Sequence, residues 1–177
     1  MQHINKNYFQ LFNVSESCEL DLDSLAGKYR ELQSDVHPDR FANAGEQAKL
    51  LAVQNSSYLN EAYDTLKSPL KRAGYLLTLH QQDIEHVNQS DLSMDLLLEQ
   101  IQLRETLGEL PEDESALADL ASLKKQVEAK IEVCHQGFAD NIERSNYHGA
   151  KMIYHELQFL YKLLVEIESA EELRLGY

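Results

Sequence analysis

Apolar residues recur at steps of three and four along most of this chain, and this spacing constrains its fold more than any other feature. One such stripe, in the first half of the chain, consists of Leu22, Leu25, Tyr29, Leu32 and Val36. A second, near the C-terminus, consists of Ile153, Leu157, Leu160 and Leu164. Side chains at this spacing line one face of an α-helix. The period-two alternation of a half-buried strand is absent over more than a few residues. The sequence therefore predicts an all-α protein.

The chain has only 3 prolines, and each one marks a break between helices. The residue before a proline is driven out of helical backbone geometry, so helices tend to end there. Pro38 follows the first stripe, helical spacing returns over 46–66, and Pro69 suits the first turn of a further helix. With the short apolar segment 8–12, the first part of the chain is expected to form four helices, two of them long.

The second part of the chain begins with a polar stretch, residues 80–90, which predicts a linker. Ser90 or Asp91 is expected to cap the next helix, and Pro111 lies in the turn that follows it. Two long helices come next, with a break near Ser145-Asn146. The predicted organisation is an N-terminal helical domain over 1–79, a linker over 80–90 and an antiparallel three-helix bundle over 91–177.

The charge of the chain is concentrated in its C-terminal part. Residues 76–177 hold 8 Lys and Arg against 20 Asp and Glu, which places about −12 of the total −14 there. This balance argues against nucleic acid or an anionic membrane as the main partner. No stretch approaches a membrane span and the N-terminus lacks the apolar run of a secretory signal, so we expect a cytoplasmic protein. Cys18 and Cys134 are far apart and form no Cys-x-x-Cys motif, so no disulfide, metal or cofactor is expected.

The densest polar feature is His37-Pro38-Asp39, at the end of a predicted helix. A His beside an Asp can act as a general base, but the spacing is unfavourable and no nucleophile or phosphate-binding motif accompanies it, so an enzyme is not predicted. A rigid loop presenting an imidazole and a carboxylate to a partner fits better, because Pro38 restricts the backbone. The alternative is purely structural: a helix-terminal His and a loop-capping Asp. Four further histidines, His80, His86, His148 and His155, are expected to be ordinary solvated side chains.

The predicted C-terminal bundle has more apolar residues than its core needs. Leu96, Leu103, Leu107 and Leu110 form one stripe that suffices to face a core, which leaves Leu97, Leu98 and Ile101 over. On the last helix Met152, Phe159 and Leu163 fall on a second face. We expect these residues to form an exposed apolar patch for a partner protein, unless the bundle buries wide faces and all of them are core.

Several motifs in the first 77 residues resemble those of a J domain, the module that activates DnaK-type chaperones. They are the loop His37-Pro38-Asp39 between two helices, Tyr8-Phe9-x-Leu11-Phe12, and Asn60-x-Ala62-Tyr63-x-x-Leu66-x-x-Pro69-x-x-Arg72-Ala73-x-Tyr75. An acidic bundle with Leu98-Glu99-x-Ile101-x-Leu103-Arg104-Glu105-x-Leu107 follows. Over nearly its whole length the chain is similar to the HscB (Jac-type) family, the co-chaperones of iron–sulfur cluster assembly.

This resemblance implies two partners and a set of residues for each. The J domain would dock on a specialised DnaK-type chaperone, HscA, and stimulate its ATPase, while the bundle would bind the scaffold protein IscU. The resemblance places His37, Pro38 and Asp39 in the stimulating loop, with basic side chains Lys28, Arg30 and Arg40 nearby. It places Leu97, Leu98, Ile101, Glu105 and Phe159 on the scaffold-binding face.

Two features keep other hypotheses open. J domains usually carry a basic second helix, but here Glu31, Ser34 and Asp35 dilute the charge, so docking is expected to be weaker or less sensitive to salt. The chain would alternatively be a J-domain co-chaperone of a different client, an acidic helical interaction protein with a structural tripeptide, or, least favoured, a His/Asp hydrolase.

Overall fold

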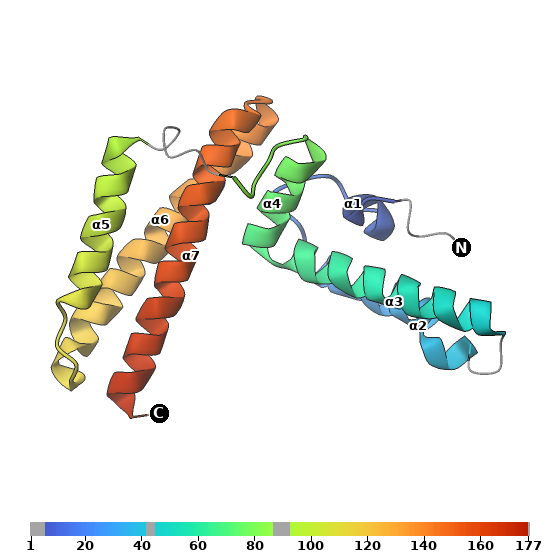
Figure 1. Ribbon diagram of the computed structural model, residues 1–177, viewed down its shortest axis with the longest axis horizontal. Coiled ribbons are helices and arrows are strands. Elements are labelled where there is room, and N and C mark those ends of the chain that lie inside the picture. The colour runs from blue at the N-terminus through green and yellow to red at the C-terminus, as the bar shows by residue number, and fades with distance from the viewer. Residues whose placement is uncertain (1–5, 42–44, 87–92, 177) are drawn as a thin grey trace. The chain divides into compact units, whose positions relative to one another are not determined.

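The computed structural model describes residues 6–41, 45–86 and 93–176, and within these ranges every regular element is helical. The fold prediction is therefore confirmed. The chain divides into two compact units, Met1–Leu76 and Leu77–Tyr177 (Figure 1). No helix in the described ranges has the length and apolar character needed to cross a membrane.

The N-terminal unit is built around two long helices that lie side by side (Figure 1). Its elements are α1 (Tyr8–Phe12), α2 (Leu22–Val36), the 3-10 turn η1 (Pro38–Phe41), α3 (Glu46–Lys67) and the start of α4 (Pro69–Leu79). Asp21 caps α2, because its carboxylate accepts hydrogen bonds from the amides of Asp23 and Ser24 at 3.0 Å each. The fully buried side chains of this unit include Phe9, Phe12, Leu25, Leu66 and Leu76.

A buried arginine joins three segments of the N-terminal unit. Arg72 lies on α4 and is only 7% exposed. Its Nε donates to the carbonyl of Cys18 at 2.8 Å and its Nη1 donates to the carbonyl of Leu66 at 2.6 Å. The guanidinium thus ties the start of α4 to the end of α3 and to the loop that precedes α2.

The C-terminal unit is a bundle of three helices, α5 (Met94–Gly108), α6 (Leu117–Glu143) and α7 (Tyr147–Leu175), with the short turn η3 (Glu114–Ala116) before α6. Helices α6 and α7 pack along their lengths, and α5 lies against α7 (Figure 1). The expected cap residues Ser90 and Asp91 lie outside the described residues. The structure shows Ser93 in this role, with its hydroxyl accepting a hydrogen bond from the amide of Leu96 at 3.2 Å.

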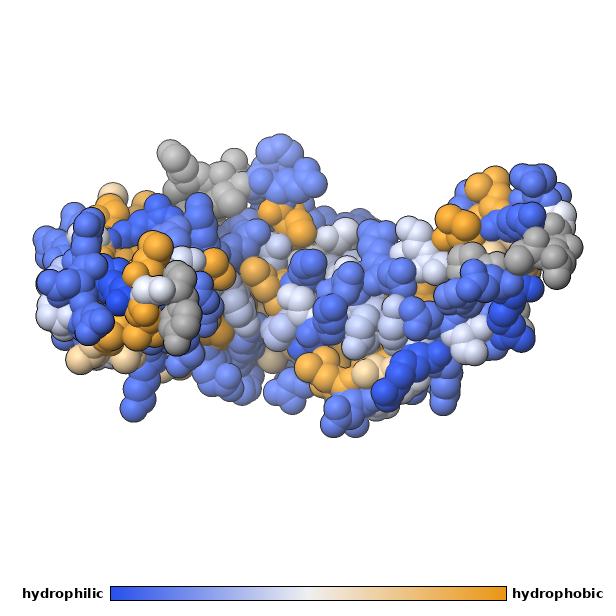
Figure 2. Space-filling model, turned by 90° about the horizontal axis from the view of Figure 1, so that it is seen from below, coloured by the Kyte–Doolittle hydropathy of each residue, from blue (hydrophilic) through white to orange (hydrophobic). Residues whose placement is uncertain are grey.

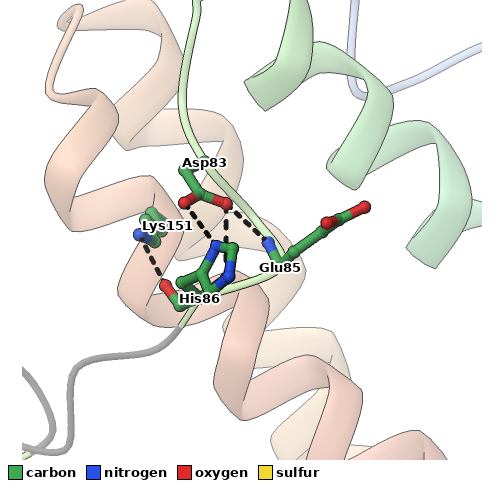
Figure 3. Close-up of polar contacts among 4 residues, drawn as sticks. All are labelled: Asp83, Glu85, His86 and Lys151. Carbon is green, nitrogen blue, oxygen red and sulfur yellow. Dashed lines mark hydrogen bonds and ion pairs between the residues drawn. The ribbon is translucent and has the colours of Figure 1, made fainter.

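The segment after α4 is fastened to the start of α7. His80 stacks on Tyr147 with ring centroids 4.1 Å apart, and the ammonium of Lys151 donates to the carbonyl of His86 at 3.1 Å. Asp83 closes a local turn: its carboxylate lies 2.7 Å from Nδ1 of His86 (Figure 3). The predicted linker is described only over 80–86, and this part contacts the bundle.

Candidate functional site

The His-Pro-Asp tripeptide forms a closed turn with its charged side chains directed to solvent. His37 is the C-cap residue of α2, and its carbonyl accepts a hydrogen bond from the amide of Arg40 at 3.1 Å. The Asp39 amide lies 3.3 Å from Nδ1 of His37, and the Asp39 carboxylate lies 3.6 Å from the same nitrogen. The side chains of His37 and Asp39 are 50% and 91% exposed. The turn therefore presents both groups at the surface, where a partner can reach them.

Two of the three basic residues near this turn are engaged within the N-terminal unit. The ammonium of Lys28 donates to the carbonyl of Asn13 at 2.9 Å. The Arg40 guanidinium donates to the carbonyl of Ser34 at 3.0 Å and to the carboxylate of Asp35 at 3.1 Å. Arg30 is exposed. Lys28 keeps its charge, because its acceptor is a neutral carbonyl, but the Asp35 carboxylate offsets the charge of Arg40. The net positive charge of this surface is thus smaller than the number of basic residues suggests.

An apolar groove of about 550 Å³ opens beside the turn, between α2, η1 and α3. It is lined by Leu32, Asp35, Val36, Arg40, Phe41, Ala48, Leu51, Ala52 and Asn55. Asn55 is 7% exposed, and its side-chain oxygen accepts no hydrogen bond from the described residues. Sequence reasoning missed this groove, because no motif marks it and its lining comes from three separate elements, α2, η1 and α3.

The outer face of α5 carries the apolar surface that was expected from the surplus of leucines. Met94, Leu98 and Ile101 are 69%, 50% and 52% exposed. Leu97 is half-buried and Glu105 is exposed on the same helix, while Leu103 is buried against the bundle. Apolar side chains also interrupt the hydrophilic surface of the C-terminal unit in the view from below (left in Figure 2).

The second apolar face expected on α7 is only partly present. Phe159 and Met152 are half-buried, but Leu163 is fully buried, so its assignment to an exposed patch was wrong. Helix α7 contacts both α5 and α6, and a helix between two neighbours buries a wider face than a single stripe predicts.

One of the histidine expectations was also wrong. His155 on α7 is buried rather than solvated, and its Nδ1 lies 2.9 Å from the side-chain oxygen of Gln158. His148 and His86 are exposed, and His80 is half-buried. No group of three or more His, Cys, Asp or Glu side chains within the described ranges is arranged to hold a metal ion.

The buried thiol of the bundle is not poised for reaction. Burial, followed by the nearby carboxylate of Glu156, raises the pKa of Cys134 to about 12. A thiol with so high a pKa holds its proton at neutral pH and is a poor nucleophile. Burial also raises the pKa of the Glu156 carboxyl above its ordinary range.

These features define a class of protein: a helical binding protein with an exposed polar turn on one unit and an apolar helix face on the other. Comparison with known proteins gives the family. The family model described as "HSCB C-terminal oligomerisation domain" matches residues 92–168. A "Co-chaperone protein HscB homolog" from Shewanella amazonensis is 39% identical over 173 residues, covering 94% of this chain and 97% of that protein.

Solved structures agree with this comparison. The "Chaperone HscB from Vibrio cholerae" has a TM-score of 0.85 at 35% identity and covers 94% of this chain and 98% of its own. The human co-chaperone protein HscB has a TM-score of 0.85 at 27% identity, and the match covers 93% of this chain and 82% of the human chain. The chain belongs to the HscB family of co-chaperones, the family of iron–sulfur cluster assembly to which its motifs pointed, and this family is non-enzymatic.

Proposed function

We propose that this protein binds an IscU-type scaffold through α5 and Phe159 and delivers it to an HscA-type chaperone, whose ATPase it stimulates through His37, Pro38 and Asp39. One observation carries this proposal: the chain presents two chemically different surfaces, an exposed polar turn and an exposed apolar helix face, on two separate compact units. A protein with one surface for each of two partners can hold both at once. Binding the first partner then makes the encounter with the second effectively intramolecular.

The polar turn suits the regulation of a chaperone. Its backbone is fixed by the proline and by the hydrogen bond between Arg40 and His37, so little conformational entropy is lost when it docks. Stimulation requires that His37 and Asp39 contact one state of the chaperone more favourably than another, since equal binding to both states shifts nothing. We include Lys28, Arg30 and Arg40 in this surface as charges that steer the encounter.

The apolar face suits the scaffold. Leu98 and Ile101 on α5 are exposed, Leu97 on the same helix and Phe159 on α7 are half-buried, and Glu105 adds an exposed charge. Buried apolar and aromatic anchors of this kind dominate protein interfaces. The proposed organisation is a J domain over 1–79, a linker over 80–90 and the scaffold-binding bundle over 91–177, working in the cytoplasm without nucleic acid or membrane.

The test is the steady-state ATPase rate of an HscA-type chaperone with this protein, with and without an IscU-type scaffold. We expect stimulation that increases when scaffold is added and is lost in His37→Gln, while scaffold binding by that variant is unchanged. His148→Gln is the matched control, because it makes the same substitution at an exposed histidine of α7. Stimulation without any effect of the scaffold would point to a different client, and no stimulation at all would reduce the tripeptide to an ordinary turn.

The scaffold surface is tested by titration calorimetry. Truncating Ile101 or Phe159 to alanine should weaken scaffold binding by about 1–4 kcal/mol and leave the ATPase stimulation by the protein alone unchanged. Val165→Ala is the control, because Val165 is 60% exposed and lies outside the proposed surface. If both classes of variant impaired both activities, the division of labour between the two units would be wrong.

A further inference from the structure

Polar contacts help to attach helix α5 to the rest of the bundle. Leu103 is the only residue of this helix that is fully buried in the described part of the chain. Two ion pairs connect α5 to its neighbours: Lys130 of α6 pairs with Glu99, and Arg104 pairs with Glu166 of α7. In the turn after α5, the carbonyls of Leu110 and Pro111 accept hydrogen bonds from Arg174 of α7. The placement of the apolar face therefore depends in part on charged side chains that are not part of that face.

The contact made by Arg104 differs from the other two because it involves an aromatic ring. The Arg104 guanidinium carbon lies 5.5 Å from the centroid of the Phe159 ring, and its Nη2 lies 3.6 Å from the carboxylate of Glu166. A guanidinium within about 6 Å of a ring centroid is attracted by the negative face of the ring. Glu166 anchors the cation, and the cation covers one side of the ring. Since Phe159 is half-buried, its orientation is set by such neighbours.

We propose that Arg104 is a positioning residue of the scaffold-binding surface: held by Glu166, it fixes the Phe159 ring beside α5 so that ring and helix present one continuous apolar face. This inference rests on the proposed function of that surface. Arg104 acts through Phe159 and needs no contact of its own with the scaffold. Removing it leaves every apolar anchor in place but releases the ring.

A double-mutant cycle measures this dependence, with scaffold affinity determined by titration calorimetry. Arg104→Ala should weaken binding of an IscU-type scaffold about two- to fivefold, the size expected of a partly exposed cation–aromatic contact. In the Phe159→Ala background the same substitution should have no further effect, because the ring on which Arg104 acts is gone. Arg104→Lys should recover most of the affinity, since a cation remains within reach of both the ring and Glu166.

The second readout is the NMR signal of the Phe159 ring in the free protein. Arg104→Ala and Glu166→Gln should both shift it, while Lys124→Ala should not. Lys124 is the matched control, because it also forms ion pairs with α7 but with other carboxylates, those of Glu168 and Glu171. The use of Glu166→Gln tests the same arrangement without altering α5.

The outcomes separate the inference from the function on which it rests. If Arg104→Ala reduced scaffold affinity equally in the wild-type and Phe159→Ala backgrounds, Arg104 would itself contact the scaffold. That result would overturn the positioning role. An unchanged Phe159 signal in Arg104→Ala would overturn it as well. If the wild-type protein bound no scaffold, the proposed function would fail, while the ring signal would still report whether Arg104 holds Phe159.

Discussion

Replacing Arg72 by alanine should destabilise the N-terminal unit and leave the bundle untouched. The guanidinium is buried, and it supplies hydrogen bonds to the carbonyls of Cys18 and Leu66. Hydrogen bonds from a charged donor contribute about 1.5–3 kcal/mol each. Alanine removes both bonds and leaves two carbonyl groups without their donor, so we expect a loss of about 3–5 kcal/mol in the free energy of unfolding.

The magnitude is large relative to the stability of the unit. At about 0.05–0.15 kcal/mol per residue, a unit of the length of Met1–Leu76 has roughly 4–11 kcal/mol of stability. A loss of about 3–5 kcal/mol should reduce hydrogen-exchange protection of the amides in α2 and α3 by about 10²–10⁴-fold, because each 1.4 kcal/mol is a factor of ten. The amides of α6 and α7 should keep their protection.

Hydrogen exchange measured by mass spectrometry reports the two units separately. Lys71→Ala is the control, since Lys71 is an exposed cation next to Arg72 on the same helix and should change little. Arg72→Lys should lose less hydrogen-exchange protection than Arg72→Ala and more than Lys71→Ala, because an ammonium cannot direct two donors as a planar guanidinium does. Equal loss of protection in both units would show that the chain unfolds as one cooperative body, and a loss below tenfold would refute the reasoning about the two carbonyls.

Three further predictions follow. Burial raises the pKa of the Glu156 carboxyl, so the folded state binds this proton more tightly than the unfolded chain, and its ionisation lowers stability as pH rises above the ordinary value of 4.5. Glu156→Gln should therefore become more stable relative to wild type across that rise, measured by urea unfolding between about pH 4 and 8. Leu163→Ala should cost about 2–5 kcal/mol in the same assay, whereas Leu98→Ala should stay within about 0.5 kcal/mol, and similar losses would refute the assigned burial. Because Asp35 offsets the charge of Arg40, ATPase stimulation should change less than about threefold between low and physiological ionic strength, and a steeper fall would contradict this reasoning.

The helices could be predicted from the sequence because their signals are local. The proline at 38 limits α2, which ends at Val36, and the proline at 69 begins α4. Apolar residues at steps of three and four fill the faces between these breaks. Such signals depend only on residues within a turn or two of each other, so they need no knowledge of the tertiary contacts.

The burial of individual side chains could not be predicted in this way. Leu163 and His155 are both buried, although the stripe on the last helix assigns neither of them to the core. Which residues of α7 are covered depends on where α5 lies, and the sequence of α7 contains no information on that. The groove beside Asn55 has the same origin, since it is formed by the relative course of α2 and α3.

The charge available at the polar turn is the clearest case in which side-chain contacts change the meaning of the sequence. Lys28, Arg30 and Arg40 count as three cations in the sequence, but the Asp35 carboxylate pairs with Arg40 and offsets its charge. In the proposed function, long-range attraction therefore contributes less to docking than the count suggests. Recognition would then depend mainly on His37 and Asp39, which are exposed and are held by the turn itself. A short-range contact of this kind is less sensitive to salt than long-range attraction and more sensitive to geometry. The shallow salt dependence and the loss of stimulation in His37→Gln are thus two consequences of one arrangement, and observing only one of them would require another source of affinity.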